Sequence, residues 1–470
     1  MPKVVDQARV SAGILAARTV AFASRKAGRG GGTSLPGQVA RWFDPAVLTR
    51  IAARLPEGSI VVAGTNGKTT TSRMIAGILA ANDRRVIHNR AGSNLVQGVT
   101  TAFVMQSSWT GTPNGTIAVI ETDEAAFPEV VRLVQPRLIV LNNLFRDQLD
   151  RYGELDTIGK SWGGSLRALP SDTVILYNAD DPGLSSVVEG VPGRTVPFGL
   201  TECEHTLEAL PHAADSRSCP RCGTDLEYRQ LYLSHLGNWH CPNCGNARPS
   251  LAVCGYEIEL NGADSSTLTV DRGSASARYV VGVPGLYNSY NALAAIAAAL
   301  ELGTPEAPIR TSLATYESAF GRAQRLDLNG RTLTLTLAKN PTGFNEVLRM
   351  YTSGGQGLTM PVLIAINDNS QDGRDVSWLW DVDFELLAAG DGTLYTTGLR
   401  SPDMANRLKY AGVPAARITD LPTNLERGLD AFVASIPAGG QGHILSTYTA
   451  MMQLHAILAK RGIVDRFWEQ

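Results

Sequence analysis

The segment VVAGTNGKTTTSRM joins an apolar run to a helical pattern through a loop of glycine and threonine residues. Gly64 and Gly67 would let the backbone pass close to a phosphate, and the N–H groups at the start of the following helix could bind its oxygens. Lys68 would reach the β- and γ-phosphates of a nucleotide, and Thr69 would offer its hydroxyl to Mg²⁺. Val62 stands where the usual phosphate-loop pattern has glycine, so a glycine-rich turn without nucleotide is the alternative interpretation.

Two Cys-x-x-Cys pairs, CPRC and CPNC, are separated by 18 residues. This spacing is typical of tetrahedral Zn²⁺ bound by thiolates, and four cysteine ligands leave no open position for a substrate. The sequence therefore predicts a structural zinc ribbon, with disulfides or a redox centre as alternatives. The expected ligands are Cys219, Cys222, Cys241 and Cys244, and the histidines that could compete are His205, His212, His235 and His240. Cys203 and Cys254 lie outside the spacing, and we expect them to be buried free thiols.

An acidic stretch, PVLIAINDNSQDGRDVSWLWDVDFE, begins with an apolar run that would form a buried strand. Asp368, Asp372 and Asp375 follow the carboxyl end of that strand, and Trp378 and Trp380 stand among further acidic residues. The residue types alone leave four interpretations open: a metal site, a catalytic site, a surface for a partner, or a solvated acidic loop.

The composition is that of an ordinary globular protein, with 44% hydrophobic and 18% charged residues among 470. A chain of this length is too long for one compact core, so we expect two or three domains. The formal net charge of -2 gives no support for a nucleic-acid-binding surface spread over the whole protein, and the residues between the cysteine pairs are not markedly basic. No apolar run approaches the roughly 20 residues of a membrane span, and the clustered cysteines favour a reducing cytoplasm.

Apolar runs alternate with helical patterns from Ser59 onward, which predicts an α/β fold with buried parallel strands. The expected strands are SIVVAG, TIAVIE, RLIVLNN and TVILYNAD, followed by TLTLTLAKN, PVLIAIND, GTLYTTG and HILSTYT, with ALAAIAAALEL as a helix before the second group. Ligand groups are expected at the carboxyl ends of such strands. The phosphate loop and the acidic stretch both follow an expected strand.

We expect three regions along the chain. They are an N-terminal helical extension (residues 1–55), a central ATP-binding domain (56–320) with the ribbon inserted at about 201–255, and a C-terminal α/β domain (321–470), with a hinge around Gly321. Arginines interrupt the apolar residues of the N-terminal segment, so it lacks a signal-peptide core. A short amphipathic helix fits better, either packed on its own domain or in contact with a membrane surface.

The loop GTNGKTT resembles the phosphate loop of the Mur ligase superfamily, which includes the folylpolyglutamate synthases. AVIETDE resembles the strand end where that family binds Mg²⁺ through a carboxylate, which implies Glu121 here, with Asp123 and Glu124 as competitors. NADDP resembles the end of the family's central sheet, and GLYNSYNALAA resembles its G-x-H-N-x-x-N segment, whose second asparagine meets the adenine. The pair Gly321-Arg322 resembles the interdomain Gly-Arg of the family.

The resemblance implies a Mur ligase-type central P-loop ATPase domain with an inserted four-cysteine zinc ribbon and a C-terminal Rossmann-like α/β domain. It also implies a ligase that phosphorylates a carboxylate with ATP, after which an amine attacks the acyl phosphate. Thr69 and Glu121 would bind Mg²⁺, and Lys68, Glu121 and Arg322 would act in catalysis. The implied nucleotide-binding residues are Gly64, Thr65, Asn66, Gly67, Lys68, Thr69, Thr70, Asn291 and Arg322.

Several features depart from an ordinary Mur ligase. The phosphate loop arrives too early in the chain for the usual N-terminal domain that holds a UDP-linked substrate. Gln148, Tyr152 and Tyr287 stand where histidines are usual, and Lys160 does not align convincingly with the carbamoylated lysine of many members. In place of D-x-A-H-N-P the chain has LAKNPTG, which puts Lys339 and Asn340 at that strand end.

These departures, the ribbon and the acidic stretch together resemble the Mur-ligase-like subunits that act with a GatD-type class I glutaminase. The resemblance implies amidation of the α-carboxylate of D-glutamate in the lipid II stem peptide, at the inner face of the plasma membrane. It also implies that the ligase subunit lends a carboxylate to the Cys–His pair of the glutaminase. We choose Asp375 for that role, with Asp372 and Asp368 as runners-up and Arg374, Trp378 and Trp380 as packing or interface residues.

Two other functions remain open. A free-standing Mur or folylpolyglutamate-type ligase would use an amino acid as nucleophile and would turn over ATP without a glutaminase. A zinc-ribbon binding protein with a vestigial nucleotide fold would keep its activity when Lys68 is replaced.

Overall fold

The computed structural model describes residues 2–26, 34–89, 93–146, 155–212, 214–261, 264–273, 275–317, 324–352 and 358–464. The chain forms two compact units. Unit 1 comprises Met1–Phe145, Glu154–Glu208 and Ser216–Tyr316, and unit 2 comprises Glu317–Gln470 with two short segments, Arg146–Gly153 and Ala209–Asp215. In the part of the chain that is described, no helix is both long and apolar enough to cross a bilayer.

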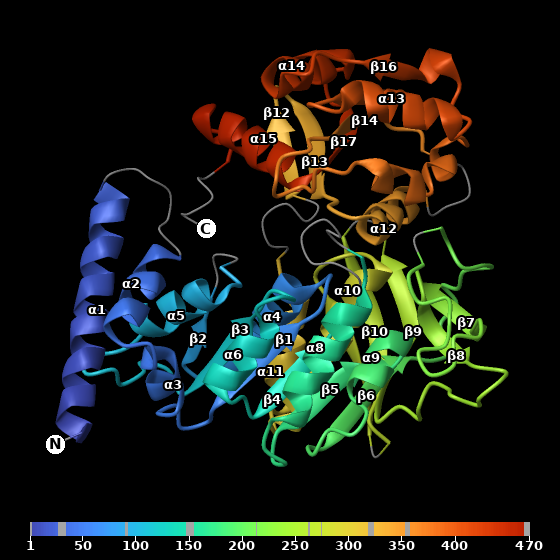
Figure 1. Cartoon of the computed structure of the whole chain (residues 1–470). Helices are drawn as coiled ribbons and strands as arrows, with labels where there is room; N and C mark the ends of the chain where they lie inside the picture. The colour runs from blue at the N-terminus through green and yellow to red at the C-terminus, as the bar shows by residue number, and fades with distance from the viewer. Residues whose placement is uncertain are drawn as a thin grey trace. The chain divides into compact units, whose positions relative to one another are not determined.

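A nine-stranded sheet forms the centre of unit 1 (Figure 1), in the order β11-β10-β9-β6-β5-β4-β1-β3-β2. Neighbouring strands in the run β9-β6-β5-β4-β1-β3-β2 pair in parallel. The pairs β9–β10 and β10–β11 are antiparallel. The four strands expected in this half of the chain, now β1, β3, β4 and β5, are confirmed as parallel neighbours. The bounds are β1 (Ser59–Ala63), β2 (Val86–His88), β3 (Ile117–Glu121), β4 (Leu138–Leu141), β5 (Val174–Asn178), β6 (Thr195–Leu200), β9 (Val253–Asn261), β10 (Ser265–Asp271) and β11 (Ser276–Val281).

Helices cover both faces of this sheet. Alternate residues of β1 point to opposite faces: Ile60 and Val62 pack in one apolar cluster, and Val61 and Ala63 in another. The first cluster receives α4 (Lys68–Ala81), α10 (Leu286–Glu301) and α11 (Glu306–Ala314). The second receives α1 (Pro2–Lys26), α2 (Leu35–Phe43), α3 (Val47–Ala52), α5 (Val96–Met105), α6 (Phe127–Val134), α8 (Leu155–Arg167) and α9 (Pro182–Val187). Burial on both faces explains why the central strands are continuous apolar runs.

The cysteine-rich segment lies between β6 and β9, which are neighbours in the sheet. It contains an antiparallel hairpin of β7 (Glu227–Leu233) and β8 (Leu236–His240). A small apolar cluster joins Cys219, Cys241, Leu226 and Trp239. The segment is therefore an insertion between two neighbouring strands, with a small apolar cluster of its own.

Unit 2 is built on a six-stranded sheet in the order β12-β13-β17-β14-β15-β16. Only the β12–β13 pair is antiparallel among these described strands. The expected strands of this half are confirmed as β13, β14, β15 and β17, so both units are α/β. The bounds are β12 (Gln324–Leu328), β13 (Arg331–Leu337), β14 (Val362–Ala365), β15 (Leu394–Thr397), β16 (Ile418–Asp420), β17 (Gln441–Ser446), α12 (Pro341–Thr352), α13 (Ser401–Tyr410), α14 (Leu425–Ser435), α15 (Tyr448–Lys460), and the 3-10 helices η1 (Ser377–Asp381), η2 (Phe384–Leu387) and η3 (Ala415–Arg417).

Candidate functional site

The phosphate-loop segment runs from the end of β1 to the start of α4, as the sequence predicts. Gly64 has a φ of +146° and Gly67, the residue before α4, has a φ of +80°. A side chain at Gly67 would collide with the amide oxygen of Asn291. Glycine is therefore required at Gly67 both by its left-handed backbone and by the close approach of α10. The loop ends at a helix N-terminus whose N–H groups can bind an anion.

The Lys68 ammonium lies over the loop and is buried. Its Nζ donates to the carbonyl oxygens of Gly64 at 2.6 Å and Thr65 at 3.0 Å. It also pairs with Oε1 of Glu124 at 3.0 Å. Glu124, which the sequence analysis treated as a competitor for Mg²⁺, is thus the ion-pair partner of Lys68 in this structure. This buried ion pair holds the ammonium at the loop, close to the place where phosphates would bind.

Two oxygens suitable for Mg²⁺ come together beside the lysine. The Thr69 hydroxyl donates to Oε1 of Glu121 at 3.0 Å. Asn89 fixes the backbone of Glu121 from both sides, accepting from its N–H at 2.9 Å and donating to its carbonyl at 2.8 Å. A carboxylate and a hydroxyl at the end of the phosphate loop are ligands of the type that Mg²⁺ takes together with nucleotide phosphates. The Asp123 carboxylate instead accepts from the N–H of Ala125 at 3.1 Å.

A set of asparagines that the sequence analysis did not single out holds the loop in place. Asn143 accepts from the N–H of Asn66 at 2.8 Å and donates to its carbonyl at 3.1 Å. Asn142 donates to the Thr71 hydroxyl at 2.9 Å, and that hydroxyl donates to Asn291 at 3.3 Å. The only sequence signal was that RLIVLNN ends in two polar residues after β4. The structure thus brings the expected nucleotide-binding residue Asn291 against the loop.

The other expected loop residues lie where they can support it. Thr65 exchanges hydrogen bonds with the backbone of Phe145, and Thr70 is buried in the first turn of α4. Arg322, Gly321, Gln148 and Tyr152 lie outside the described residues. Tyr287 packs against the apolar cluster of α10, Lys160 is exposed on α8, and the buried Asn340 accepts from the N–H of Gly343 at 2.8 Å. Lys339 precedes Asn340 between β13 and α12.

The four cysteines of the paired motifs converge. Their sulfur atoms all lie within 4.8 Å of one another, with Cys219 and Cys244 at 3.6 Å and Cys222 and Cys241 at 3.5 Å. Sulfurs at about 2.3 Å from a tetrahedral Zn²⁺ would be about 3.75 Å apart. The donor type and spacing therefore fit this metal. Hydrogen bonding, chiefly with Thr224, lowers the pKa of the Cys222 thiol to about 6.

The two cysteine turns have the same backbone construction. Gly223 N–H bonds to the carbonyl of Cys219, and Gly245 N–H to that of Cys241. Both glycines have positive φ values, +75° and +71°. None of the four nearby histidines joins the cluster within the described chain; His240, for example, lies 3.1 Å from Glu227. Cys203 is buried and Cys254 half-buried, and neither is disulfide-bonded.

A buried carboxylate at Asp180 connects the ribbon to the helix that carries Asn291. Its oxygens accept from the Arg248 guanidinium at 2.6 Å, the Tyr290 hydroxyl at 2.7 Å and the N–H of Leu200 at 2.8 Å. Burial raises the pKa of Asp180, and Arg248 opposes that shift. Trp239 of the ribbon donates to the carbonyl of Ala179, the residue before Asp180, at 3.0 Å. The sequence of NADDP resembles a family motif but gives no sign of this network.

The three acidic candidates of unit 2 differ in their surroundings. Asp368 pairs with Arg400 at 2.7 Å. Asp372 is buried and accepts from the N–H of Thr449 at 2.7 Å and from its hydroxyl. Asp375 is exposed, and it accepts from the N–H of Ser377 at 2.8 Å at the start of η1. This hydrogen bond lowers the pKa of the Asp375 carboxyl, so an exposed, ionised carboxylate is presented here.

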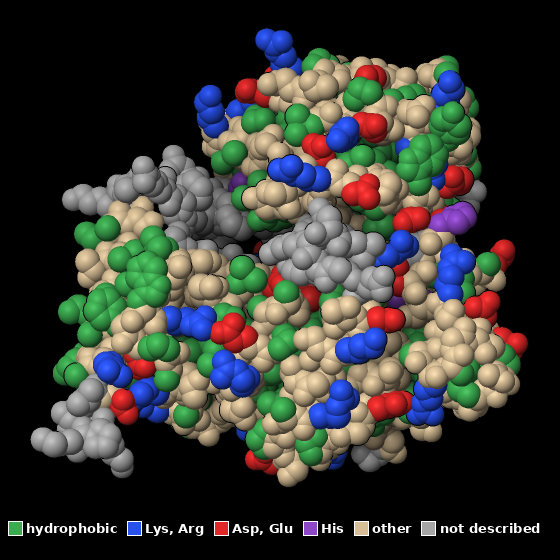
Figure 2. All heavy atoms as spheres, viewed as in Figure 1, with side chains coloured by type: hydrophobic (Ala, Val, Ile, Leu, Met, Phe, Trp, Pro, Cys, Tyr) green, Lys and Arg blue, Asp and Glu red, His purple; other side chains and the backbone are tan. Residues whose placement is uncertain are grey.

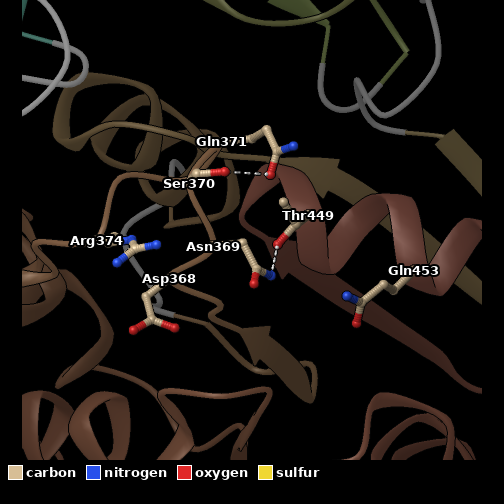
Figure 3. A pocket seen from close by; sticks show the side chains of 7 residues that line it. All are labelled: Asp368, Asn369, Ser370, Gln371, Arg374, Thr449 and Gln453. Atoms are coloured by element: carbon tan, nitrogen blue, oxygen red, sulfur yellow. Dashed lines mark hydrogen bonds between the residues drawn. The ribbon is translucent and has the colours of Figure 1, made fainter.

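A polar pocket of about 540 Å³ borders this stretch. Its walls come from the loop after β14 and from α15, and Asn369 donates to the Thr449 hydroxyl at 2.8 Å across it (Figure 3). The lining residues are Asp368, Asn369, Ser370, Gln371, Arg374, Thr449 and Gln453. Arg374 belongs to this wall, whereas Trp378 packs on Phe344 and Trp380 lies beside Tyr410.

A parallel sheet with a phosphate loop after β1 is typical of nucleotide-binding domains, and here a second α/β unit accompanies it. The model for the Mur ligase middle domain matches residues 62–219. The solved structure of MurF from Thermotoga maritima in complex with ADP has a similar fold, with a TM-score of 0.62 at 13% identity over 89% of this chain and 83% of that one. A folylpolyglutamate synthase from Mycobacterium tuberculosis, complexed with ADP, has a TM-score of 0.58 at 14% identity over 88% of this chain and 93% of that one.

Closer relatives narrow the class. The model for the MurT ligase C-terminal domain matches residues 337–451. The lipid II isoglutaminyl synthase (glutamine-hydrolyzing) subunit MurT of Streptococcus pneumoniae is 34% identical over 460 residues, 97% of this chain and 99% of that protein. The subunit of the same name from Staphylococcus aureus is 37% identical over 402 residues, 85% of this chain and 87% of that protein. The chain therefore belongs to the MurT family of Mur ligases.

Proposed function

We propose that this chain is the ATP-dependent ligase subunit of a lipid II isoglutaminyl synthase. ATP would phosphorylate the α-carboxylate of D-glutamate in the lipid II stem peptide, releasing ADP. Ammonia would then attack the acyl carbon of this acyl phosphate, and inorganic phosphate would leave with formation of D-isoglutamine. The observation that carries the proposal is the Lys68, Thr69 and Glu121 arrangement at the phosphate loop in a chain that aligns with MurT over nearly its whole length.

The residues near the loop supply the chemistry that this reaction needs. Lys68 would neutralise charge on the transferred phosphoryl group, and the N–H groups at the start of α4 would bind the other phosphates. Thr69 and Glu121 would hold Mg²⁺, which bridges phosphates and stabilises charge that develops during transfer. Asn291 would meet the adenine, and Arg322 would approach the phosphates.

The ammonia would come from a GatD-type class I glutaminase bound as a heterodimer. Asp375 is our candidate for the carboxylate that orients the partner's catalytic histidine. Its two rivals are engaged inside unit 2, Asp368 by Arg400 and Asp372 by Thr449, whereas the Asp375 side chain is exposed. The subunit would work in the cytoplasm, peripherally at the inner face of the plasma membrane where lipid II is present.

Reconstitution tests this function directly. The chain is co-expressed with the glutaminase and incubated with lipid II, ATP, Mg²⁺ and glutamine, and the product is examined by mass spectrometry. We expect one carboxyl group of the stem peptide to become an amide, with one ATP consumed for each amide formed. ATP turnover that requires a free amino acid and no glutaminase would instead identify a free-standing amino acid ligase.

Replacing Asp375 with asparagine should reduce glutamine hydrolysis by the complex roughly 10²- to 10⁴-fold, because the amide cannot stabilise an imidazolium. The measurement is glutamate release from glutamine, with ATP affinity as the control for an intact unit 1. Asp391→Asn is the matched exposed substitution in unit 2 and should leave hydrolysis unchanged. Equal rates in both variants would show that Asp375 is not the orienting group.

We further propose that the four-cysteine cluster binds one structural Zn²⁺. Elemental analysis of the purified chain should find zinc in stoichiometric amount. Cys219→Ser should lose that zinc and make the ribbon susceptible to protease, because the metal supplies folding free energy to such small elements. Cys254→Ser, outside the cluster, should retain the metal; zinc retained in both variants would reject the assignment.

A further inference from the structure

Helix α1 of unit 1 has two apolar faces. Val10, Ile14 and Ala17 are buried in the cluster beneath the helix. On another side of the helix, the Leu15 and Phe22 side chains are 68% and 67% exposed. They are seven residues apart, so they lie two turns apart on the same face. An outer helix face in water normally carries charged or polar residues. The exposed apolar stripe therefore indicates a surface that is covered in use.

Neighbouring elements extend this surface. Leu35, Trp42 and Phe43 of α2 are exposed, as is Trp109 in the loop after α5, and the two tryptophans are 71% and 70% exposed. We call Leu15, Phe22, Leu35, Trp42, Phe43 and Trp109 the α1–α2 surface. Figure 2 shows hydrophobic side chains gathered where Figure 1 places α1 and α2, at the left of the view.

Contacts between the elements hold the α1–α2 surface together. A Cβ on Gly13 of α1 would lie 3.0 Å from the carbonyl oxygen of Ala40 and 3.4 Å from Cβ of Phe43, so the helices cross closely there. Arg18 donates to the carbonyl of Ser107, and Gln7 to that of Thr110 at 2.7 Å. These hydrogen bonds fix the loop that carries Trp109 to α1, so the position of Trp109 relative to α1 is defined.

The charge around the α1–α2 surface is positive. Among the side chains that the structure describes, α1 carries Arg9 and Arg18, and Arg54 lies beside it, donating to the Gln7 side chain of α1 at 3.1 Å. Asp6 is the acidic residue of α1. Asp6 is paired with Arg50 at 2.9 Å, and Glu129 near α2 is paired with Arg41 at 2.6 Å. Two copies of this face would bring like charges together, which disfavours a self-complementary dimer.

We infer that the α1–α2 surface docks the protein onto an anionic phospholipid bilayer. Tryptophan and phenylalanine side chains partition into the headgroup region, and basic residues are attracted by anionic lipids. The surface would hold the enzyme at the leaflet that contains its lipid-linked substrate, and in this respect the inference rests on the proposed function. The inference goes beyond the proposed function because it identifies the part of the chain that contacts the bilayer.

Vesicle co-sedimentation tests the inference with no substrate and no ATP, so its outcome is independent of the proposed reaction. The full chain, alone and with its glutaminase, is mixed with phosphatidylglycerol-containing vesicles or with phosphatidylcholine vesicles. We expect binding to the anionic vesicles only, and weaker binding at high salt. The double variant Phe22→Glu/Trp42→Glu should bind at least tenfold more weakly, with an unchanged thermal unfolding midpoint because both side chains are exposed.

The matched control is Val280→Glu/Tyr410→Glu, which places the same charges at exposed apolar positions outside the α1–α2 surface and should bind vesicles like the native chain. Three results would overturn the inference. They are no binding to anionic vesicles, equal loss in the two double variants, and disappearance of vesicle binding when the glutaminase or a second copy covers the α1–α2 surface.

Discussion

Replacing Lys68 with methionine should lower ATP-dependent amidation by roughly 10³-fold or more, because a charge that would stabilise the transferred phosphoryl group is removed. The native ammonium contacts the carbonyls of Gly64 and Thr65, so the substitution removes a positive charge from the loop where phosphates are expected to bind. The measurement is amide formation on lipid II by the reconstituted complex, together with titration of a fluorescent ATP analogue. The same variant should retain glutamine hydrolysis by the partner.

A simple loss of folding must be separated from this result, because the substitution leaves Glu124 buried without its cation. An uncompensated buried charge is itself destabilising. The double variant Lys68→Met/Glu124→Gln removes both charges and should recover thermal stability without recovering amidation. Lys160→Met, exposed on α8, should behave like the native chain. Amidation within a few-fold of native in Lys68→Met would contradict the assigned role and favour a vestigial nucleotide site.

Replacing Asp180 with asparagine should destabilise unit 1 by about 3–5 kcal/mol, the usual cost of removing one partner of a buried ion pair. The change keeps the size of the side chain but leaves the Arg248 guanidinium without its carboxylate. It also weakens the hydrogen bond from Tyr290, the neighbour of Asn291 in α10. Denaturant unfolding followed by tryptophan fluorescence measures the loss, since Trp239 donates to the carbonyl beside Asp180.

The same network makes a second outcome measurable. Because Tyr290 precedes Asn291, the Asp180→Asn variant should also bind the ATP analogue more weakly before it unfolds. Asp172→Asn, an exposed substitution of the same type, should change the free energy of unfolding by less than about 0.5 kcal/mol. Combining Asp180→Asn with Arg248→Met should cost less than the sum of the two single changes, as expected for directly paired residues. Additive costs would show that the pair is not coupled.

Local sequence patterns predicted the parts of the fold that depend on neighbouring residues. The buried strands β1, β3, β4 and β5 were recognisable because both of their faces are apolar. The local pattern did not predict β2, which has only three residues, nor β9 and β11, in which exposed or half-buried residues alternate with buried ones. β2 and β11 are the two edge strands of the sheet, and strands that bury less apolar surface have a weaker hydrophobic pattern.

The candidate site divides in the same way. The glycine–lysine–threonine loop and the two cysteine pairs were readable because their chemistry depends on residues a few positions apart. The pairing of Lys68 with Glu124, the support of the loop by Asn142 and Asn143, and the Asp180 network each join residues more than 50 positions apart. The sequence contains these residues but gives no sign of which ones meet.

The sequence by itself identified the residues that could do chemistry, namely a phosphate-loop motif, two cysteine pairs and an acidic stretch after a strand. The tertiary structure decided how the carboxylates are used. In unit 2, Asp368 and Asp372 are bound to Arg400 and Thr449, whereas Asp375 is exposed. At the phosphate loop, Glu124 pairs with Lys68, and Glu121 accepts from the Thr69 hydroxyl. The physical reason is that a carboxylate's role depends on its burial and its nearest partner, and both are properties of the folded chain.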